Sequence, residues 1–159
     1  MKNIITGFVT ILTILTLVCS CEKDNSIKDV FDDENITTLA GTWKVLSYDD
    51  FTHNTQIKKD TNITWKEFNN GDVIITFTDT IPTGQMHGRT VTNEVFAGYT
   101  LSEHRKINVE NFFGTKMNQP EWADLFWEGI TKSEEYSVNN KQLRIFYNSG
   151  KNSITFEKE

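Results

Sequence analysis

Apolar and polar residues mostly alternate along the chain from residue 39 onward, which is typical of β-strands that bury one face. The clearest alternation lies at the end of the chain, where Asn139-Asn140 and residues 149–151 separate three short runs. The two asparagines can supply the positive-φ positions of a tight hairpin. Alternating segments also cover residues 39–48, 72–78, 87–93, 94–102 and 105–111. The pattern predicts a mainly antiparallel β domain.

The first of these runs, residues 39–48, has an alternation that assigns its side chains to two faces. Trp43 and Val45 fall on one face, and Leu46 and Tyr48 fall on the other, because successive side chains of a strand point to opposite sides. We therefore expect Trp43 and Tyr48 to lie on different faces of the sheet.

One segment, residues 120–132, has helical rather than alternating periodicity. Its apolar residues recur at the spacing i, i+3, i+4, i+7, i+8, namely Trp122, Leu125, Phe126, Gly129 and Ile130. Pro120 is tolerated at the first helical position. Trp127 lies off the apolar face, so we expect it to be exposed. The segment predicts a helix packed on the sheet, and the alternative is an aromatic stripe for a ligand or a membrane.

The predicted fold class is therefore mainly β (α+β), with an antiparallel β-barrel or strongly curved sheet and one helix, about 120–132, packed on it. Side chains from alternate strand positions would face inward. An eight-stranded barrel has room either for one small ligand or only for packed side chains, and the sequence leaves both alternatives open. We assign residues 39–159 to a single β domain.

The N-terminus has the features of a secretory signal. Lys2 is followed by an apolar, uncharged stretch at residues 4–18, which is shorter than a membrane-spanning helix requires. A membrane-spanning anchor is the alternative interpretation. Residues 18–21, Val-Cys-Ser-Cys, resemble the bacterial lipobox, with Cys21 as the lipid acceptor. This resemblance implies a lipoprotein signal peptide at 1–20, which would carry Cys19 away and preclude a Cys19–Cys21 disulfide.

Residues 21–38 are then expected to form the lipidated cysteine and an acidic tether. The protein would reach the membrane through the lipid anchor at Cys21, with the domain attached to the outer membrane on its periplasmic or surface-exposed face. The chain has a formal net charge of −6 at pH 7. An acidic domain lacks the basic surface that nucleic-acid binding requires, so we expect no nucleic-acid partner.

Two later segments, residues 88–101 and 114–130, resemble the META domain of bacterial envelope lipoproteins when read in this order. The family pattern has an Asn before a Tyr, then a Thr-x-Met step, a helix and a closing hairpin. Asn93, Tyr99, Thr115 and Met117 take those places. Many members carry a cysteine just before the Asn, whereas this chain has a threonine.

The resemblance covers about residues 72–158 and implies a small β-rich domain without established catalytic residues. Gly41-Thr42-Trp43 also resembles the first strand of lipocalin-like lipoproteins, in which the Trp closes one barrel end.

Catalytic, metal and cofactor motifs are absent from the sequence. The histidines, His53, His87 and His104, lack the short spacing of a metal site. The adjacent acids Asp49-Asp50 and Glu134-Glu135 would point to opposite faces of a strand, so we interpret them as solvated charges. We therefore expect no enzyme activity, no catalytic residue, no metal and no cofactor.

These observations predict a non-enzymatic, monomeric cell-envelope lipoprotein that binds a small apolar molecule or an envelope component. The alternative is a protein-interaction module, such as an inhibitor of a lytic or proteolytic enzyme, that uses an exposed loop at residues 81–90. Asp79-Thr80-Ile81 also matches a short O-glycosylation pattern of secreted bacterial proteins, with Thr80 as the acceptor.

Overall fold

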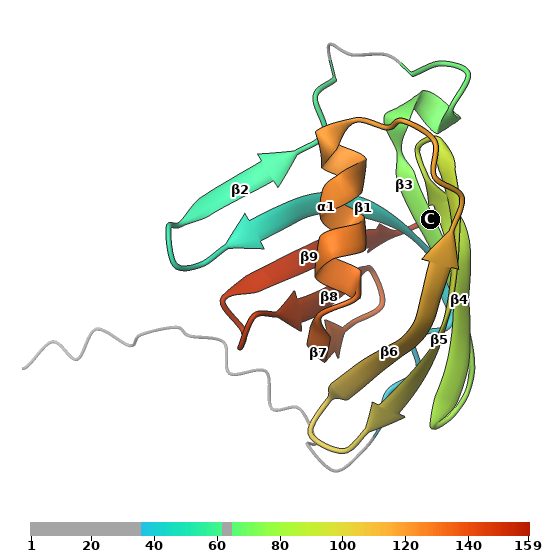
Figure 1. Ribbon diagram of the computed structural model, residues 1–159. Coiled ribbons are helices and arrows are strands. Elements are labelled where there is room, and N and C mark those ends of the chain that lie inside the picture. Colours follow the sequence, from blue (N-terminus) through green and yellow to red (C-terminus); the bar gives the residue numbers. More distant parts are fainter. Residues whose placement is uncertain (1–35, 62–64) are drawn as a thin grey trace, which may run out of the picture. The chain divides into compact units, whose positions relative to one another are not determined.

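The computed structural model describes residues 36–61 and 65–159 (Figure 1). The predicted signal peptide, the predicted lipid acceptor Cys21 and nearly all of the predicted tether lie outside the described residues, so these assignments stay predictions. In the described part of the chain, we find no helix with the length and apolar character needed to span a bilayer.

An antiparallel β-barrel forms the body of the domain. In residues 36–61 and 65–159, eight strands follow one another in the order β1-β3-β4-β5-β6-β7-β8-β9, and β9 closes the barrel by pairing with β1. These strands are β1 (Gly41–Asp50), β3 (Val73–Thr80), β4 (Thr83–Thr90), β5 (Asn93–Ser102), β6 (Lys106–Gly114), β7 (Ser133–Val138), β8 (Gln142–Tyr147) and β9 (Asn152–Lys158). The barrel confirms the predicted fold class.

Three further elements complete the domain. The short strand β2 (Thr55–Lys58) pairs with the second half of β1. A 3-10 turn, η1 (Asn69–Gly71), precedes β3. The helix α1 (Glu121–Ile130) follows β6 and packs on the barrel, which confirms the helix predicted there (Figure 1).

The helix lies next to the seam between β6 and β7, where the barrel has little hydrogen bonding between strands. Among the described residues, the registered pair between β6 and β7 is Lys106 with Glu135. Phe126 of α1 is fully buried, and its ring centroid lies 6.4 Å from that of Phe112 on β6 and 6.5 Å from that of Phe156 on β9. The apolar face of α1 therefore completes the core next to this seam.

Side chains fill the interior of the barrel. The inward-facing positions of the strands and the apolar face of α1 form one buried hydrophobic cluster. Its largest fully buried members are Trp43, Tyr136, Phe77, Phe126, Phe156, Leu39, Ile75, Met86, Leu101, Ile130, Leu143 and Ile145. Of the two alternatives that the sequence left open, the structure thus has the packed core.

A polar clamp holds the chain where it enters the barrel. Leu39 is fully buried, and its backbone N–H donates to Oδ2 of Asp79 at 2.8 Å. The hydroxyls of Thr38 and Tyr99 donate to the same carboxylate at 2.8 and 3.1 Å. Trp43 donates its indole N–H to the carbonyl of Leu39 at 2.9 Å. Trp43 is thus buried at this end of the barrel, as the lipocalin-like resemblance implied.

The structure corrects the predicted faces of β1. The register with β9 shifts between Val45 and Ser47, which is a β-bulge. A bulge inserts one extra residue and thereby reverses the alternation that follows it. Trp43, Val45 and Tyr48 are consequently all buried in the core, and the expectation that Tyr48 faces away from Trp43 was wrong.

Two turn predictions were also wrong. Residues 81–90 are not an exposed loop, because β4 occupies most of this range and pairs along its length with β3 and β5. In the hairpin after β7, Asn139 and Asn140 keep negative φ. The side-chain oxygen of Asn139 instead accepts the backbone N–H groups of Lys141 and Gln142 at 2.9 and 2.8 Å. Such side-chain-closed turns are a common alternative use of asparagine.

Candidate functional site

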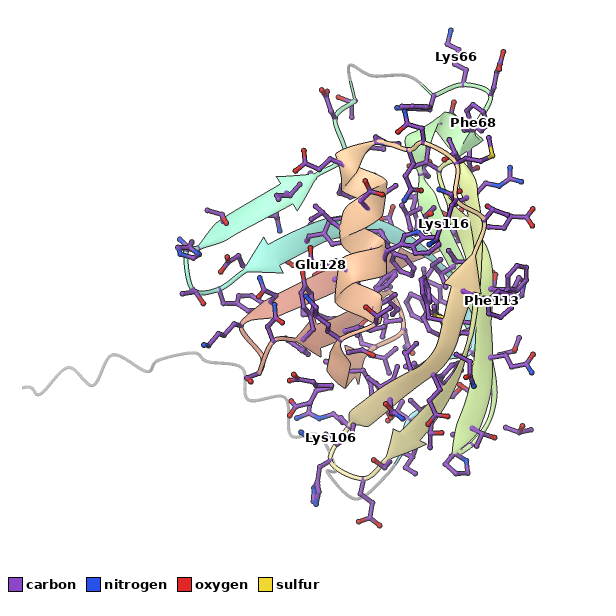
Figure 2. The ribbon with its side chains drawn as sticks, in the orientation of Figure 1. Lys66, Phe68, Lys106, Phe113, Lys116 and Glu128 are labelled. Carbon is purple, nitrogen blue, oxygen red and sulfur yellow. The ribbon has the colours of Figure 1, made fainter. Side chains whose placement is uncertain are left out.

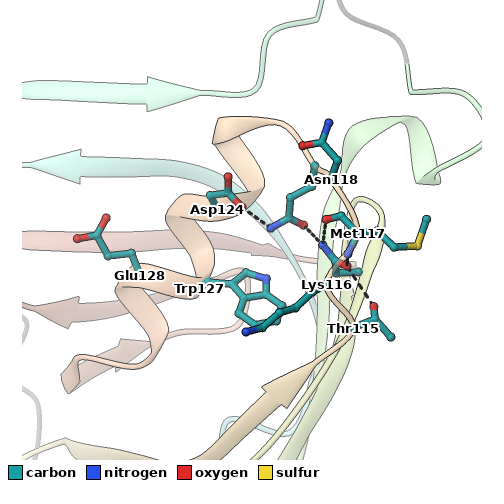
Figure 3. Close-up of a pocket in the computed structure, with 9 residues that line it drawn as sticks. Thr115, Lys116, Met117, Asn118, Asp124, Trp127 and Glu128 are labelled. Carbon is teal, nitrogen blue, oxygen red and sulfur yellow. Dashed lines mark hydrogen bonds between the residues drawn. The ribbon is translucent and has the colours of Figure 1, made fainter.

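A groove of about 680 Å³ lies beside α1, at the end of the barrel opposite the Asp79 clamp. Its walls are the segment that joins β6 to α1, the start of β5 and one face of the helix (Figure 3). The lining residues are Asn93, Thr115, Lys116, Met117, Asn118, Gln119, Asp124, Trp127 and Glu128.

Asn93 fixes the shape of this groove. The side chain is 2% exposed and uses both sides of its carboxamide. Its Nδ2 donates to the carbonyl of Met117 at 2.9 Å and to Oε1 of Gln119 at 2.8 Å. Its Oδ1 accepts the N–H of Met117 at 2.6 Å and the hydroxyl of Thr115 at 3.2 Å. Asn93 thereby holds the irregular segment 115–119 against the start of β5.

A second set of hydrogen bonds orients the helix side of the groove. The buried hydroxyl of Thr90 donates to Oε1 of Gln119 at 2.9 Å and accepts the indole N–H of Trp127 at 3.0 Å. Gln119 donates its Nε2 to Asp124 of α1 at 2.7 Å. A polar network whose members are satisfied rigidifies the elements that it joins. The groove is therefore preformed.

Trp127 is half-buried in this network, so the prediction that it is exposed was wrong. Its ring centroid lies 4.9 Å from that of Phe112, with the two rings perpendicular. Gly114 permits this packing, because an added Cβ there would lie 3.0 Å from the Trp127 ring and 2.2 Å from the carbonyl oxygen of Glu94. The C-terminal end of β6 and the helix are thus held in close contact.

Charges of both signs line the groove. Lys116 is exposed, and its ammonium has no ion-pair partner within the described ranges. Asp124 and Glu128 lie on the helix wall (Figure 3). Glu128 forms an ion pair with Lys132 at 2.9 Å, one helical turn away. Lys116 is therefore the cation that remains available to an anionic group entering the groove.

Exposed apolar side chains lie on the neighbouring outer face of β5 and β6. Phe96 and Phe113 are cross-strand partners whose stacked rings lie 5.5 Å apart, with 40% and 62% of their surfaces exposed. Phe113 points away from the barrel (Figure 2). Met117, four residues after Phe113, is 55% exposed. An exposed apolar surface of this kind is common at interaction sites.

The structure brings together most of the residues on which the family resemblance rests. Asn93, Thr115 and Met117 meet in one hydrogen-bond network, whereas Tyr99 lies near the other end of its strand against Asp79. Burial and then the Asp79 carboxylate raise the pKa of Tyr99 well above its usual value, so its hydroxyl is a neutral donor. Thr92, where many members have cysteine, donates its hydroxyl to the carbonyl of Asn118 at 3.1 Å.

The groove also contains residues that the sequence did not single out as functional. Lys116 and Gln119 belong to a polar stretch between a strand and a helix, and that stretch has no periodicity. Helical spacing alone predicts that Trp127 lies outside the apolar face of the helix. Its contact with Thr90 joins residues 37 positions apart, which no local pattern reveals.

The histidines lie apart from the groove. In the turn after β1, Nδ1 of His53 forms a hydrogen bond with Oδ2 of Asp50 at 2.8 Å. His87 lies on β4, and His104 follows β5. In the part of the chain that the structure describes, we find no cluster of three or more His, Cys, Asp or Glu side chains that could hold a metal ion.

Asp49 departs from the prediction that it is a solvated charge. It is 9% exposed and accepts hydrogen bonds from hydroxyls on β1 and β9 and from the amide of Gln56. Burial alone would raise the pKa of Asp49, but the hydrogen bonds, led by that from Thr155, outweigh burial and lower it. This carboxylate joins β1, β2 and β9 on the outer face of the barrel.

Comparison with known proteins places this architecture in a family. A crystal structure of a DUF4847 family protein from Bacteroides vulgatus has a similar fold, with a TM-score of 0.55, 17% sequence identity and coverage of 76% of this chain and 93% of that chain. No curated protein matches the sequence significantly. The family model of the META domain matches residues 37–159, which include the barrel, α1 and the Asn93 network. The chain therefore belongs to the META domain family.

Proposed function

We propose that this domain is a non-enzymatic binding module of the bacterial cell envelope and that it holds its ligand in the groove beside α1. The observation that carries the proposal is the preformed groove next to a filled barrel. Packed side chains occupy the barrel interior, whereas the groove offers about 680 Å³ on a rigid frame. Small-molecule sites are commonly concave and preformed, with a few placed polar groups.

The lining favours an amphipathic ligand with an anionic group. Trp127 and Met117 provide apolar surface, and Lys116 provides an ammonium without an ion partner among the described residues. A carboxylate or phosphate beside Lys116 would form a charge-assisted hydrogen bond, which is stronger than a neutral one. Envelope lipids and their degradation products have this combination of an acyl chain and an anionic end.

Octanoate should bind the purified protein, and Lys116→Gln should weaken this binding roughly tenfold. The estimate corresponds to a charged hydrogen bond of about 1.5 kcal/mol. Octanol, which has the same chain length without the charge, should bind both proteins equally. Titration followed by NMR at the Trp127 indole N–H would measure these affinities and report the location.

Lys66→Gln serves as the matched control, because Lys66 is an exposed lysine outside the groove (Figure 2). An equal loss of octanoate binding in both variants would reveal nonspecific charge attraction. Absence of any shift at Trp127 with octanoate would contradict the groove assignment.

A protein-interaction module, such as an enzyme inhibitor, is the second candidate. The stacked and exposed Phe96 and Phe113 favour it, because exposed aromatic side chains are enriched in protein interfaces. This candidate requires that Phe113→Ser abolish capture of an envelope protein while octanoate binding stays unchanged. The reverse result would favour the small-molecule function.

The location in the envelope rests on the lipobox-like residues at 18–21, and we propose that Cys21 carries the lipid. Cys21→Ser should abolish metabolic labelling with a radioactive fatty acid and leave the precursor unprocessed. Cys19→Ser should have little effect, because residue 19 belongs to the predicted signal peptide and is removed when that peptide is cleaved. Equal loss of label in both variants would contradict the assignment of Cys21.

A further inference from the structure

One edge of β6 lacks a neighbouring strand over most of its length. Within residues 36–61 and 65–159, the registered pair between β6 and β7 is Lys106 with Glu135, so the edge from Ile107 onward has no paired strand. This open edge continues past the end of β6 into the segment 115–119, which forms one wall of the groove. The nearby helix α1 cannot replace a strand there, because the backbone groups of a helix bond to one another.

The backbone groups that point to this open edge follow from hydrogen bonds on its other side. The N–H of Thr115 donates to the carbonyl of Glu94 on β5 at 3.0 Å. Both backbone groups of Met117 bond to the buried carboxamide at the start of β5. Neighbouring residues of an extended chain point these groups to opposite sides. Gly114 and Lys116 therefore point away from β5, and among the described residues the N–H and C=O of Lys116 have no hydrogen-bond partner.

The two halves of this edge differ in how well they are protected. Folded proteins commonly protect an unpaired edge with a bulge or with charged side chains. The first half of β6 has both, because its register with β5 shifts between Glu110 and Phe113, and Lys106 and Glu110 are exposed charges. Residues 112–118, which we call the free edge, carry only the charge of Lys116. The free edge is therefore open to pairing.

Apolar side chains lie on both faces of the free edge. Phe113 is 62% exposed and points away from the barrel (Figure 2), and Met117 is 55% exposed and points away from α1 (Figure 3). Trp127 lines the groove on the other face. An added strand presents alternate side chains to its two faces. One such strand would cover Phe113 and Trp127 together, whereas a small ligand in the groove leaves Phe113 exposed.

We propose that the free edge binds an extended acidic segment of another protein as an added β-strand. The backbone of this segment pairs with Gly114 and Lys116, as in other cases of β-strand addition. A carboxylate of the segment pairs with the ammonium of Lys116, which has no ion-pair partner in the described part of the chain. The inference rests on the proposed function in one respect, because the segment enters the same groove and uses the same lysine.

The test uses the purified full-length protein and the peptide acetyl-Val-Glu-Val-Glu-Val-Glu-Val amide. Its counterpart is N-methylated at every residue, which removes the backbone donors and keeps the side chains and their charge. The unmethylated peptide should bind at least about tenfold more tightly. Its binding should slow the hydrogen exchange of the Gly114 and Lys116 amides measured by NMR, because these amides become hydrogen-bonded. The amides of β2, which pairs with β1 alone, should not change.

Two variants of Lys116 separate the backbone from the charge. Lys116→Gln and Lys116→Pro both remove the ammonium, and only proline also removes the N–H at the free edge. Lys116→Gln should weaken peptide binding about fivefold, and Lys116→Pro should weaken it at least a further fivefold or so. Because this N–H has no partner among the described residues, proline breaks no hydrogen bond there. The melting temperature checks that the proline variant is folded, and the methylated peptide tests the same point without it.

Three outcomes would overturn the proposal. They are equal affinity of the two peptides, slowed exchange at β2 instead of the free edge, and absence of binding by both peptides. Octanoate that binds at Trp127 while the two peptides bind equally would leave the small-molecule function intact. Peptide binding that slows exchange at Gly114 and Lys116, without octanoate binding, would support strand addition and contradict the small-molecule function. The two proposals therefore fail separately.

Discussion

Asn93→Ala should lower the free energy of unfolding by about 3–5 kcal/mol. The variant removes the four hydrogen bonds that the carboxamide makes to Met117, Gln119 and Thr115. A hydrogen bond of this kind contributes about 0.5–1.5 kcal/mol. Because domains of this size are stable by only about 5–15 kcal/mol, much of the total would be lost. Urea unfolding followed by circular dichroism would measure the change.

Asn108→Ala is the matched control for this substitution. Asn108 lies on β6 and donates only to Glu110, at 2.6 Å, on the exposed face. The expected change is within about 0.5 kcal/mol, as for most surface substitutions. A loss of less than 1 kcal/mol in Asn93→Ala would mean that the segment 115–119 keeps its place without the carboxamide. Octanoate binding should fall together with stability in Asn93→Ala, because the network shapes the groove.

Phe126→Ala should destabilise the domain by about 3–5 kcal/mol, which is the usual cost of removing a buried phenyl ring. Phe126 contacts Phe112 of β6 and Phe156 of β9, so its loss leaves a cavity between α1 and these two strands. The backbone amides of these two strands should then exchange hydrogen faster than those of β4 and β5. Hydrogen exchange measured by mass spectrometry would resolve this difference.

Glu121→Ala tests whether the effect of Phe126 comes from packing or from the helix in general. Glu121 is the first residue of α1 and is exposed. Its removal costs a favourable interaction with the helix dipole of about 0.3–1 kcal/mol. If both variants destabilise the domain equally, α1 contributes through its own helicity and not through the core contacts at the seam.

The sequence predicted the elements whose side-chain periodicity reflects a single buried face. The C-terminal hairpins and α1 follow this rule, because Leu143 and Ile145, or Phe126 and Ile130, face one core. The bulge after Val45 broke the rule, since one inserted residue reverses the alternation without a signature in the sequence. The predicted loop at residues 81–90 is a strand instead, because β4 pairs with two neighbouring strands although it is rich in glycine and polar residues.

The candidate site was predictable only in part. The family resemblance marked Asn93, Thr115 and Met117, and these residues do meet. Their role as a frame for the groove depends on hydrogen bonds between positions 22–24 residues apart, which periodicity does not encode. The filled interior was equally beyond the sequence, because the same inward-facing residues are compatible with a cavity or with a packed core.

The Asp79 clamp and the groove lie at opposite ends of the barrel. The clamp fixes Leu39 near one end of the barrel. Asn93 and the groove lie at the start of β5, and the two ends of this ten-residue strand are about 30 Å apart. Residues 36–39 thus enter the domain at the end remote from the groove. A domain held at residue 36 would therefore present its groove at the end away from the point at which it is held.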